Sequence, residues 1–217
     1  MGPLTIDRAT TLALHATGAF DWMTQSVDED EHSLEMHLPY IHKILRRTFK
    51  DSEGTPQLVP IMVGNTSPST EKKLGEILAP YLADPETAWV ISSDFAHWGA
   101  RFRYTYYEPS SSSPTNLTSR SKTPTNPPIH KSIKAVDFRC MGACEQGKHE
   151  GWLEVLEETG NTVCGRHPIG VVMAGLEVLE KEGKGSGRFR FVRYERSSEV
   201  KGPGESSVSY ASAFAVV

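Results

Sequence analysis

The sequence predicts an α/β protein with a mainly parallel central sheet flanked by helices. Two short apolar runs, 58–63 and 88–91, are separated by a helical pattern at 70–82. This strand, helix, strand order is typical of α/β folds. The run Ala-Trp-Val-Ile at 88–91 is apolar at consecutive positions, which suits a strand covered on both faces, as parallel strands are. At 217 residues the chain is long enough to form a single domain, 1–217.

Several segments have the apolar spacing of helices that pack on such a sheet. A helix is expected within 7–22, so the chain is expected to open on a helix with no strand before it. The segment 38–49 has one apolar face, and Thr70 is expected to cap the helix at 70–82. Two more helices are expected at 151–158, ending at a glycine, and from Pro168 onward.

The end of the chain and one internal segment complete the expected organisation. The segments 189–194 and 208–216 are predicted to be strands, and arginines alternate with apolar residues in the first of them. Between 109 and 131 the composition falls to Ser, Thr, Pro and Asn, with few side chains that could be buried. Ordering such a segment costs more free energy than its burial returns. We therefore predict a disordered insertion within the domain.

Charge, hydropathy and cysteine content exclude several classes of protein. The formal net charge is −4, from 23 Lys and Arg against 27 Asp and Glu, which gives no reason to expect nucleic acid as a partner. No apolar run reaches the roughly 18 residues that a membrane-spanning helix needs. Three cysteines, Cys140, Cys144 and Cys164, do not form a closed set of disulfides. A reducing compartment is therefore expected, the cytoplasm with the nucleus as an alternative.

The segment 91–104 contains the first candidate functional residues. Asp94 and His97 follow a predicted buried strand, at the end where open α/β sheets form ligand crevices. A histidine titrates near neutral pH, and a nearby carboxylate holds its tautomer, which suits a general acid or base. The alternative is that Asp94 caps a turn and His97 packs beside Trp98.

Cys164 is the second candidate, in the segment 162–170. It lies just before the helix expected to start at Pro168, where the helix dipole favours a thiolate. A thiolate binds metals or attacks electrophiles. The alternative is that Cys164 is a small buried apolar residue, which is the commoner role of a lone cysteine.

A third candidate lies in the acidic segment 28–38. Acidic residues stabilise the start of a helix, which accounts for most of this charge but not for His32 and His37. Together with Glu35 or Glu31, these histidines are a candidate ligand-binding or metal-binding cluster.

Four segments, in this order, resemble the successive signatures of the Memo family, whose name refers to cell motility. They are 28–40 (DEDEHSLEMHLPY), 92–99 (SSDFAHWG), 164–170 (CGRHPIG) and 206–211 (SSVSYA). The Memo family is related to class III extradiol dioxygenases of the LigB type. The resemblance thus implies a LigB-like, mainly parallel α/β sheet flanked by helices.

The resemblance also implies roles for individual residues. His97 matches the acid/base histidine of the dioxygenases, Asp94 its neighbour in the pocket and Arg101 a basic pocket residue. Cys164 matches the Memo metal ligand, at a place where the dioxygenases have a carboxylate. A thiolate is a softer ligand that suits copper, zinc or iron–sulfur chemistry more than oxygen activation at iron.

The family's upstream motifs, His-Ala-Gly-Tyr and Gly-Pro-Ser-His-His, are not found in this sequence. The resemblance implies that these motifs lie in an N-terminal segment and that their histidines supply the other metal ligands. Because this segment is not found, the fold is expected to be truncated at its N-terminus. A copper or iron ion, expected in a complete family member, should then bind weakly or not at all. The remaining histidines are not assigned as substitute ligands; they are His15, His42, His130, His149 and His167.

Several functions remain open at this stage. The first is a non-catalytic or redox-linked signalling adaptor that binds a metal ion or a phosphorylated or other anionic group, with phosphotyrosine peptides or signalling proteins as partners. Arg101 supplies donors for phosphate. The alternatives are an iron- or copper-dependent oxidoreductase, a hydrolase using Cys164, His97 and Asp94, and an inactive fragment. Catalysis is the less favoured class.

Overall fold

The computed structural model describes residues 4–49 and 55–217. The chain divides into two compact units, 1–64 and 65–217, which are described separately. Helices and strands are both present, so the predicted mixed α/β class is confirmed.

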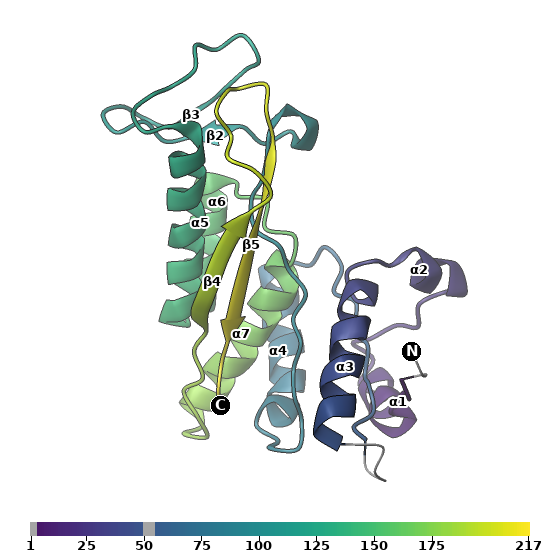
Figure 1. Cartoon of the computed structure of the whole chain (residues 1–217). Helices are drawn as coiled ribbons and strands as arrows, with labels where there is room; N and C mark the ends of the chain where they lie inside the picture. The colour runs from purple at the N-terminus through teal and green to yellow at the C-terminus, as the bar shows by residue number, and fades with distance from the viewer. Residues whose placement is uncertain (1–3, 50–54) are drawn as a thin grey trace. The chain divides into compact units, whose positions relative to one another are not determined.

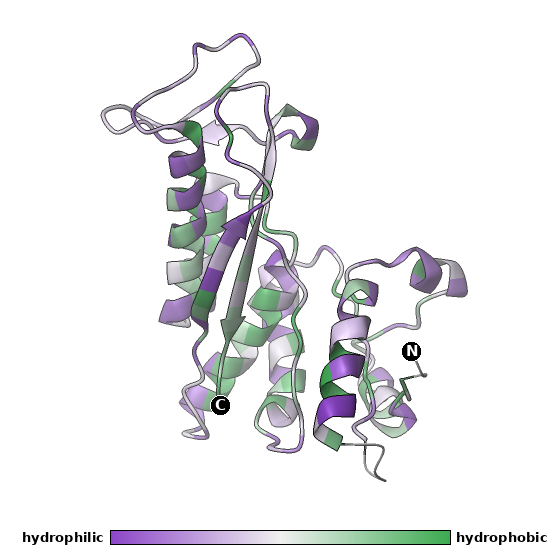
Figure 2. Cartoon of the chain, in the orientation of Figure 1, coloured by the Kyte–Doolittle hydropathy of each residue, from purple (hydrophilic) through white to green (hydrophobic). Residues whose placement is uncertain are grey.

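The first unit consists of short helices. Asp7 begins the first of them, because its side chain accepts a hydrogen bond from the backbone N–H of Thr10. The predicted helix at 38–49 is confirmed, and its apolar and polar residues alternate along the ribbon (Figure 2). The predicted strand at 58–63 is wrong apart from Leu58, which forms an isolated parallel bridge with Ile6. The elements are α1 (Arg8–Ala16), α2 (Gln25–Asp30), η1 (Glu35–His37) and α3 (Leu38–Phe49).

The second unit is built around helices that pack behind a two-stranded ribbon (Figure 1). Its helices are α4 (Pro68–Leu82), η2 (Ala100–Phe102), α5 (Ile129–Gln146), α6 (His149–Thr159) and α7 (Arg166–Lys181). Its strands are β1 (His97–Trp98), β2 (Tyr106–Tyr107), β3 (Thr115–Asn116), β4 (Arg190–Arg196) and β5 (Ser207–Phe214). The largest core cluster joins side chains of α5, α6 and α7, including Cys140, Trp152 and Met173, to Phe191 and Tyr194 on β4.

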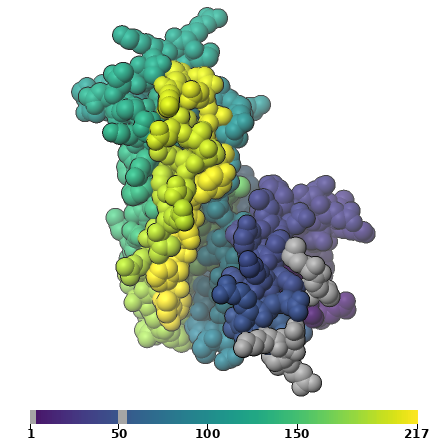
Figure 3. Space-filling view, viewed as in Figure 1, coloured from purple at the N-terminus to yellow at the C-terminus, as the bar shows by residue number. Residues whose placement is uncertain are grey.

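The predicted mainly parallel sheet is not what the described strands form. The order β1-β5-β4 is antiparallel throughout, and so is the pair β2-β3. For the β4–β5 pair, the connection 197–206 is too short for a parallel arrangement, which needs a crossover of about a dozen residues or more. The segment 88–91 is not a strand, and Val90 is 54% exposed, so this segment is not covered on both faces. The outer face of the β4–β5 ribbon forms a continuous strip of surface (Figure 3).

The helices α4 and α7 pack unusually closely because glycines lie at their contact. A Cβ on Gly75 would lie 2.6 Å from the backbone nitrogen of Gly175, and a Cβ on Gly175 would lie 2.6 Å from Leu82 Cδ1. The predicted helix at 70–82 is confirmed, but Ser67, not Thr70, is its N-cap: the Ser67 side chain accepts from the Thr70 N–H.

The other predicted elements of this unit are confirmed with small shifts in their bounds. The helix α6 ends at Gly160, whose φ of 60° lies in the left-handed region that favours glycine. The helix α7 begins two residues before Pro168, and β4 and β5 correspond to the predicted terminal strands.

The segment 109–131 has some contacts with the rest of the unit. The strand β3 pairs with β2, and Leu117 is buried in the same cluster as Trp98. The helix α5 begins at Ile129, inside the range predicted to be disordered, and Ile129 is buried. The disorder of the residues between these anchors stays a prediction.

Candidate functional site

His97 is held in place from two sides. On one side, β1 pairs with β5, with His97 opposite Val208. On the other, the His97 backbone N–H donates to Thr162 Oγ1 at 2.8 Å, and Thr162 Oγ1 lies 3.3 Å from the His97 carbonyl oxygen. Gly99 ends β1, and a Cβ there would lie 2.6 Å from Ser206 Cβ. The segment is therefore fixed between the β-ribbon and the loop before α7.

The hydrogen bonds of the His97 ring define its neutral tautomer. Nδ1 lies 3.1 Å from the Phe95 carbonyl oxygen and 3.3 Å from the Thr162 carbonyl oxygen. Both partners only accept, so Nδ1 carries the proton. Nε2 then carries the lone pair, and it lies 3.4 Å from Asp94 Oδ2, with both side chains partly exposed. In this tautomer Nε2 is the acceptor nitrogen of His97, and it faces the Asp94 carboxylate.

Arg101 is connected to His97 through an aromatic ring. The Arg101 guanidinium carbon lies 4.4 Å from the centre of the Phe102 ring, a cation–π arrangement. The Phe102 ring meets the His97 ring edge to face, with centroids 5.2 Å apart. No carboxylate of residues 4–49 and 55–217 forms a salt bridge with Arg101. Its exposed guanidinium therefore keeps its donors for a ligand.

The loop that carries Cys164 adjoins the loop that carries Asp94. The Cys164 N–H donates to the Asp94 carbonyl oxygen at 3.2 Å, and the Gly165 N–H donates to Ser93 Oγ at 3.0 Å. A Cβ on Gly165 would lie 2.4 Å from the Ser92 carbonyl oxygen, so this close approach requires glycine. Cys164 itself is exposed and is not a buried apolar residue, whereas Cys140 and Cys144 are buried.

Buried polar residues behind the site are functional candidates that the sequence did not suggest. Asp137, on α5, accepts from the Ala96 N–H at 3.2 Å, from Asn161 Nδ2 at 3.0 Å and from the Tyr194 hydroxyl at 2.8 Å. Burial raises the pKa of the Asp137 carboxyl, and these donors only partly oppose the shift. Asp137 thus links both site loops, at Ala96 and Asn161, to α5 and β4.

The histidines of the acidic segment belong to the first unit, which is described separately from the unit that carries the residues above. His32 and Glu35 are exposed, and His37 is partly buried at the end of η1. Glu31 has a local role: burial opposes its ionisation, but hydrogen bonds from Ser33 and the Leu34 N–H hold its pKa below the usual value. The proposed ligand cluster of His32, Glu35 and His37 stays a prediction.

The described residues do not fit a complete metal centre. Within 4–49 and 55–217, no group of three or more His, Cys, Asp or Glu side chains is arranged to hold a metal ion. Cys164 therefore stands as a single candidate ligand.

Across residues 4–49 and 55–217, no helix is both long and apolar enough to cross a membrane.

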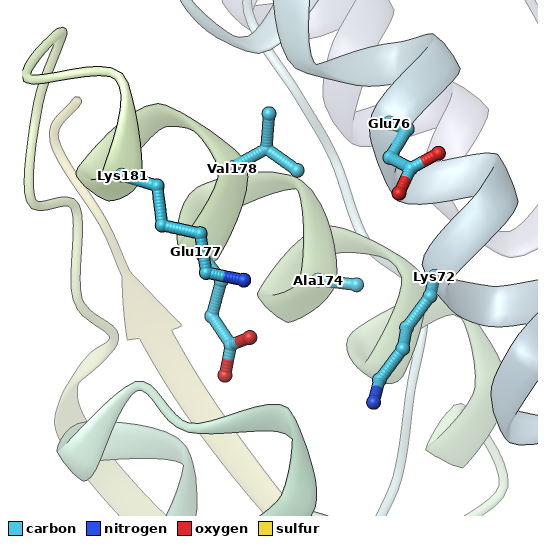
Figure 4. Close-up of a pocket in the computed structure, with 6 residues that line it drawn as sticks. All are labelled: Lys72, Glu76, Ala174, Glu177, Val178 and Lys181. Atoms are coloured by element: carbon cyan, nitrogen blue, oxygen red, sulfur yellow. The ribbon is translucent and has the colours of Figure 1, made fainter.

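Two surface pockets lie outside the candidate site. One, of about 90 Å³, lies between α4 and α7 (Figure 4) and is far below the ~300 Å³ of typical small-molecule sites. It is lined by Lys72, Glu76, Ala174, Glu177, Val178 and Lys181. The other, of about 380 Å³, is lined by Lys134, Tyr194, Glu195, Arg196, Ser198 and Glu199. Neither is lined by a residue that the sequence suggested for the site.

Comparison with known proteins identifies the family. Residues 1–214 match the family model described as Memo-like protein. Protein MEMO1 of Xenopus tropicalis is 41% identical over 214 residues, which are 99% of this chain and 65% of the relative. Protein MEMO1 of Homo sapiens is 40% identical over 208 residues, 96% of this chain and 63% of the relative. A MEMO1 family protein of Schizosaccharomyces pombe is 37% identical over 219 residues, 99% of this chain and 69% of the relative. The chain thus spans slightly less than two thirds of the vertebrate proteins and matches them along almost its whole length, and it belongs to the Memo family.

Proposed function

We propose that this Memo-family chain is a non-catalytic binding protein of the signalling-adaptor type, and that its site takes a phosphorylated or other anionic group. The observation that carries the proposal is the arrangement of Arg101, Phe102 and His97. The Arg101 guanidinium lies over the Phe102 ring, which meets the His97 ring edge to face, and Arg101 is exposed and forms no salt bridge with a described carboxylate. A guanidinium fork is a strong donor to phosphate oxygens.

Titration with phosphotyrosine peptides, followed by fluorescence polarisation, tests this function. The phosphorylated peptide should bind more tightly than its unphosphorylated control. Arg101→Gln should weaken binding about tenfold or more, because a hydrogen bond to a charged group contributes ~1.5–3 kcal/mol.

A matched control removes the same charge elsewhere. Arg193→Gln, on the exposed surface of β4, should leave the affinity unchanged, since Arg193 pairs with Glu195 and not with the site. Equal binding of both peptides to the wild-type protein would refute the phosphate-binding function. Equal losses of affinity in Arg101→Gln and Arg193→Gln would show that the peptide is bound only by non-specific attraction between charges.

A metal-dependent oxidoreductase related to the LigB-type dioxygenases is the second candidate. It is favoured by the contact between the loops of His97 and Cys164, which brings an imidazole and a thiol to one region. Elemental analysis of the purified chain decides this candidate. Copper or iron near one equivalent, lost in Cys164→Ser, would support it, whereas trace metal only would remove it, because the chemistry of such enzymes belongs to the ion.

A further inference from the structure

A buried carboxylate joins the three helices α4, α6 and α7 next to the candidate site. Glu71 Oε2 lies 2.6 Å from His149 Nε2, and Glu71 Oε1 lies 2.6 Å from His167 Nδ1. The Glu71 side chain is 2% exposed, that of His149 is 0% exposed and that of His167 is 17% exposed. Thr66 Oγ1 adds contacts at 3.2 Å to His167 Nδ1 and at 3.4 Å to Glu71 Oε1.

The backbone of α7 is shaped to admit this carboxylate. A Cβ on Gly170 would lie 2.4 Å from Glu71 Oε2, so any larger residue would displace the carboxylate. The His149 backbone N–H donates to Glu177, also on α7, at 2.8 Å. Glu71 and its two histidines are therefore a built arrangement at the start of α6 and α7, and not a chance contact between surface side chains.

An ionised Glu71 accepts from both rings and so defines their tautomers. His149 carries its proton on Nε2, and its buried Nδ1, which has no hydrogen-bond partner among the described residues, carries a lone pair. His167 carries its proton on Nδ1, so its Nε2 is the basic nitrogen and lies on the partly exposed side chain. A histidine oriented in this way by a carboxylate is a stronger acceptor at its second nitrogen.

His167 lies in the first turn of α7, directly after the turn of Cys164 and Gly165. That turn contacts the other site loop through backbone donors, Cys164 N–H to Asp94 and Gly165 N–H to Ser93 Oγ. Because the turn leads directly into α7, its position also depends on where the first turn of α7 is held. Trp152 Nε1, which donates to the Arg166 carbonyl oxygen at 3.0 Å, and Glu71, which contacts His167, are among the side chains that hold it.

We propose that Glu71 is a positioning residue of the candidate site: through His167 it fixes the first turn of α7, and with it the Cys164 turn against Asp94 and Ser93. The proposal rests on the proposed function only in treating the Cys164 turn as part of the site. Its test measures the turn and the histidine directly. A failure to bind phosphopeptide or metal would therefore leave it standing.

Nitrogen-15 NMR of the full chain gives the first readout. In the wild-type protein, His167 should be protonated at Nδ1 near neutral pH. In Glu71→Gln, the amide nitrogen should turn toward His167, because turning it toward His149 would force a proton onto the buried, unpartnered Nδ1 of that ring. His167 should then switch its proton to the partly exposed Nε2. A wild-type His167 protonated at Nε2 alone, or a His167 that keeps its Nδ1 proton in the variant, would overturn the proposal.

Amide hydrogen exchange gives the second readout. In Glu71→Ala, exchange of the Cys164 and Gly165 amides should speed up and become insensitive to low concentrations of urea, as in a local opening. Exchange of the Cys140 and Cys144 amides, which lie in the buried helix α5, should still speed up with urea, as global opening does. Glu71→Gln, which keeps a hydrogen bond to each ring, should restore slow exchange at the turn. The control Glu76→Ala removes an exposed carboxylate from the same helix and should change neither set. An equal dependence on urea at all four amides, or no faster exchange at the turn, would show that Glu71 only stabilises the fold.

Discussion

Replacing Glu71 with alanine should lower the free energy of unfolding by about 3–5 kcal/mol, because it removes two buried hydrogen bonds to a charged acceptor, each worth ~1.5–3 kcal/mol. The variant leaves the N–H groups of His149 and His167 without their acceptor, and His149 is completely buried. Urea denaturation followed by circular dichroism measures this loss as a lower midpoint with an unchanged slope.

The control and the pH dependence make this expectation specific. Glu76→Ala, at an exposed position on the same helix, should cost less than ~0.5 kcal/mol.

Burial opposes ionisation of Glu71, but the N–H donors of His149 and His167 outweigh it and hold the pKa of Glu71 below the ordinary value of 4.5. The stabilisation by the Glu71 carboxylate is then complete above that value and is lost as the pH falls through the lowered folded-state pKa. A loss below ~1 kcal/mol near neutral pH, or one that grows on acidification, would contradict this account.

The helices that the sequence predicts well are those with strong local signals. The helix at 38–49 has a pronounced apolar face, and the glycine at position 160 ends α6 in the left-handed conformation. The helix α5 was missed, because its first turn follows the Ser- and Pro-rich segment and carries His130 and Lys131. Its buried positions, such as Ile129, Ile133, Val136 and Cys140, do have helical spacing, which was the available signal.

The sheet was predicted less well because pairing is a long-range property. The apolar run at 88–91 resembles a buried strand, yet a strand exists only where a neighbour supplies hydrogen bonds. Among the backbone hydrogen bonds of the described residues, the pairing of β5 with this part of the chain begins at Phe95. Hydrophobicity identifies an extended segment but not its partner or its direction.

The candidate site is likewise only partly predictable from the sequence. Asp94, His97 and Cys164 lie in distinctive local motifs, so the sequence indicated both loops, although their roles stay predictions. Glu71 could not be identified, because a glutamate in an amphipathic helix is expected to face solvent. Its partners His149 and His167 are 78 and 96 positions away. No local pattern encodes that contact, and only the close packing of α4 against α7 produces it.

Asp137→Ala should cost about 3 kcal/mol, the second large effect that we expect. The change leaves the Ala96 N–H, Asn161 Nδ2 and the Tyr194 hydroxyl without the acceptor that now joins them. Each buried donor left without an acceptor lowers the free energy of unfolding by ~1–3 kcal/mol. Removing the carboxylate also removes the cost of burying its charge, which offsets part of this loss. Urea denaturation measures the loss. The His97 ring should also lose its fixed tautomer, since Ala96 follows Phe95 and Asn161 precedes Thr162, the two residues whose carbonyl oxygens accept from the ring.

Asp137→Asn separates the hydrogen bonds from the charge. Its amide oxygen still accepts from Ala96 and Asn161, and its amide nitrogen donates to the Tyr194 hydroxyl, so the variant should be about as stable as wild type in weak acid. Burial raises the folded-state pKa of Asp137 above the ordinary 3.8, so in the wild type the unfolded state ionises first and stability falls as the pH rises from that value through the raised pKa. The asparagine has no such loss, and its stability relative to wild type should increase as the pH rises above about 4. A difference that stays constant with pH would mean that Asp137 is ionised at no cost, and that its donors, rather than its burial, control its charge.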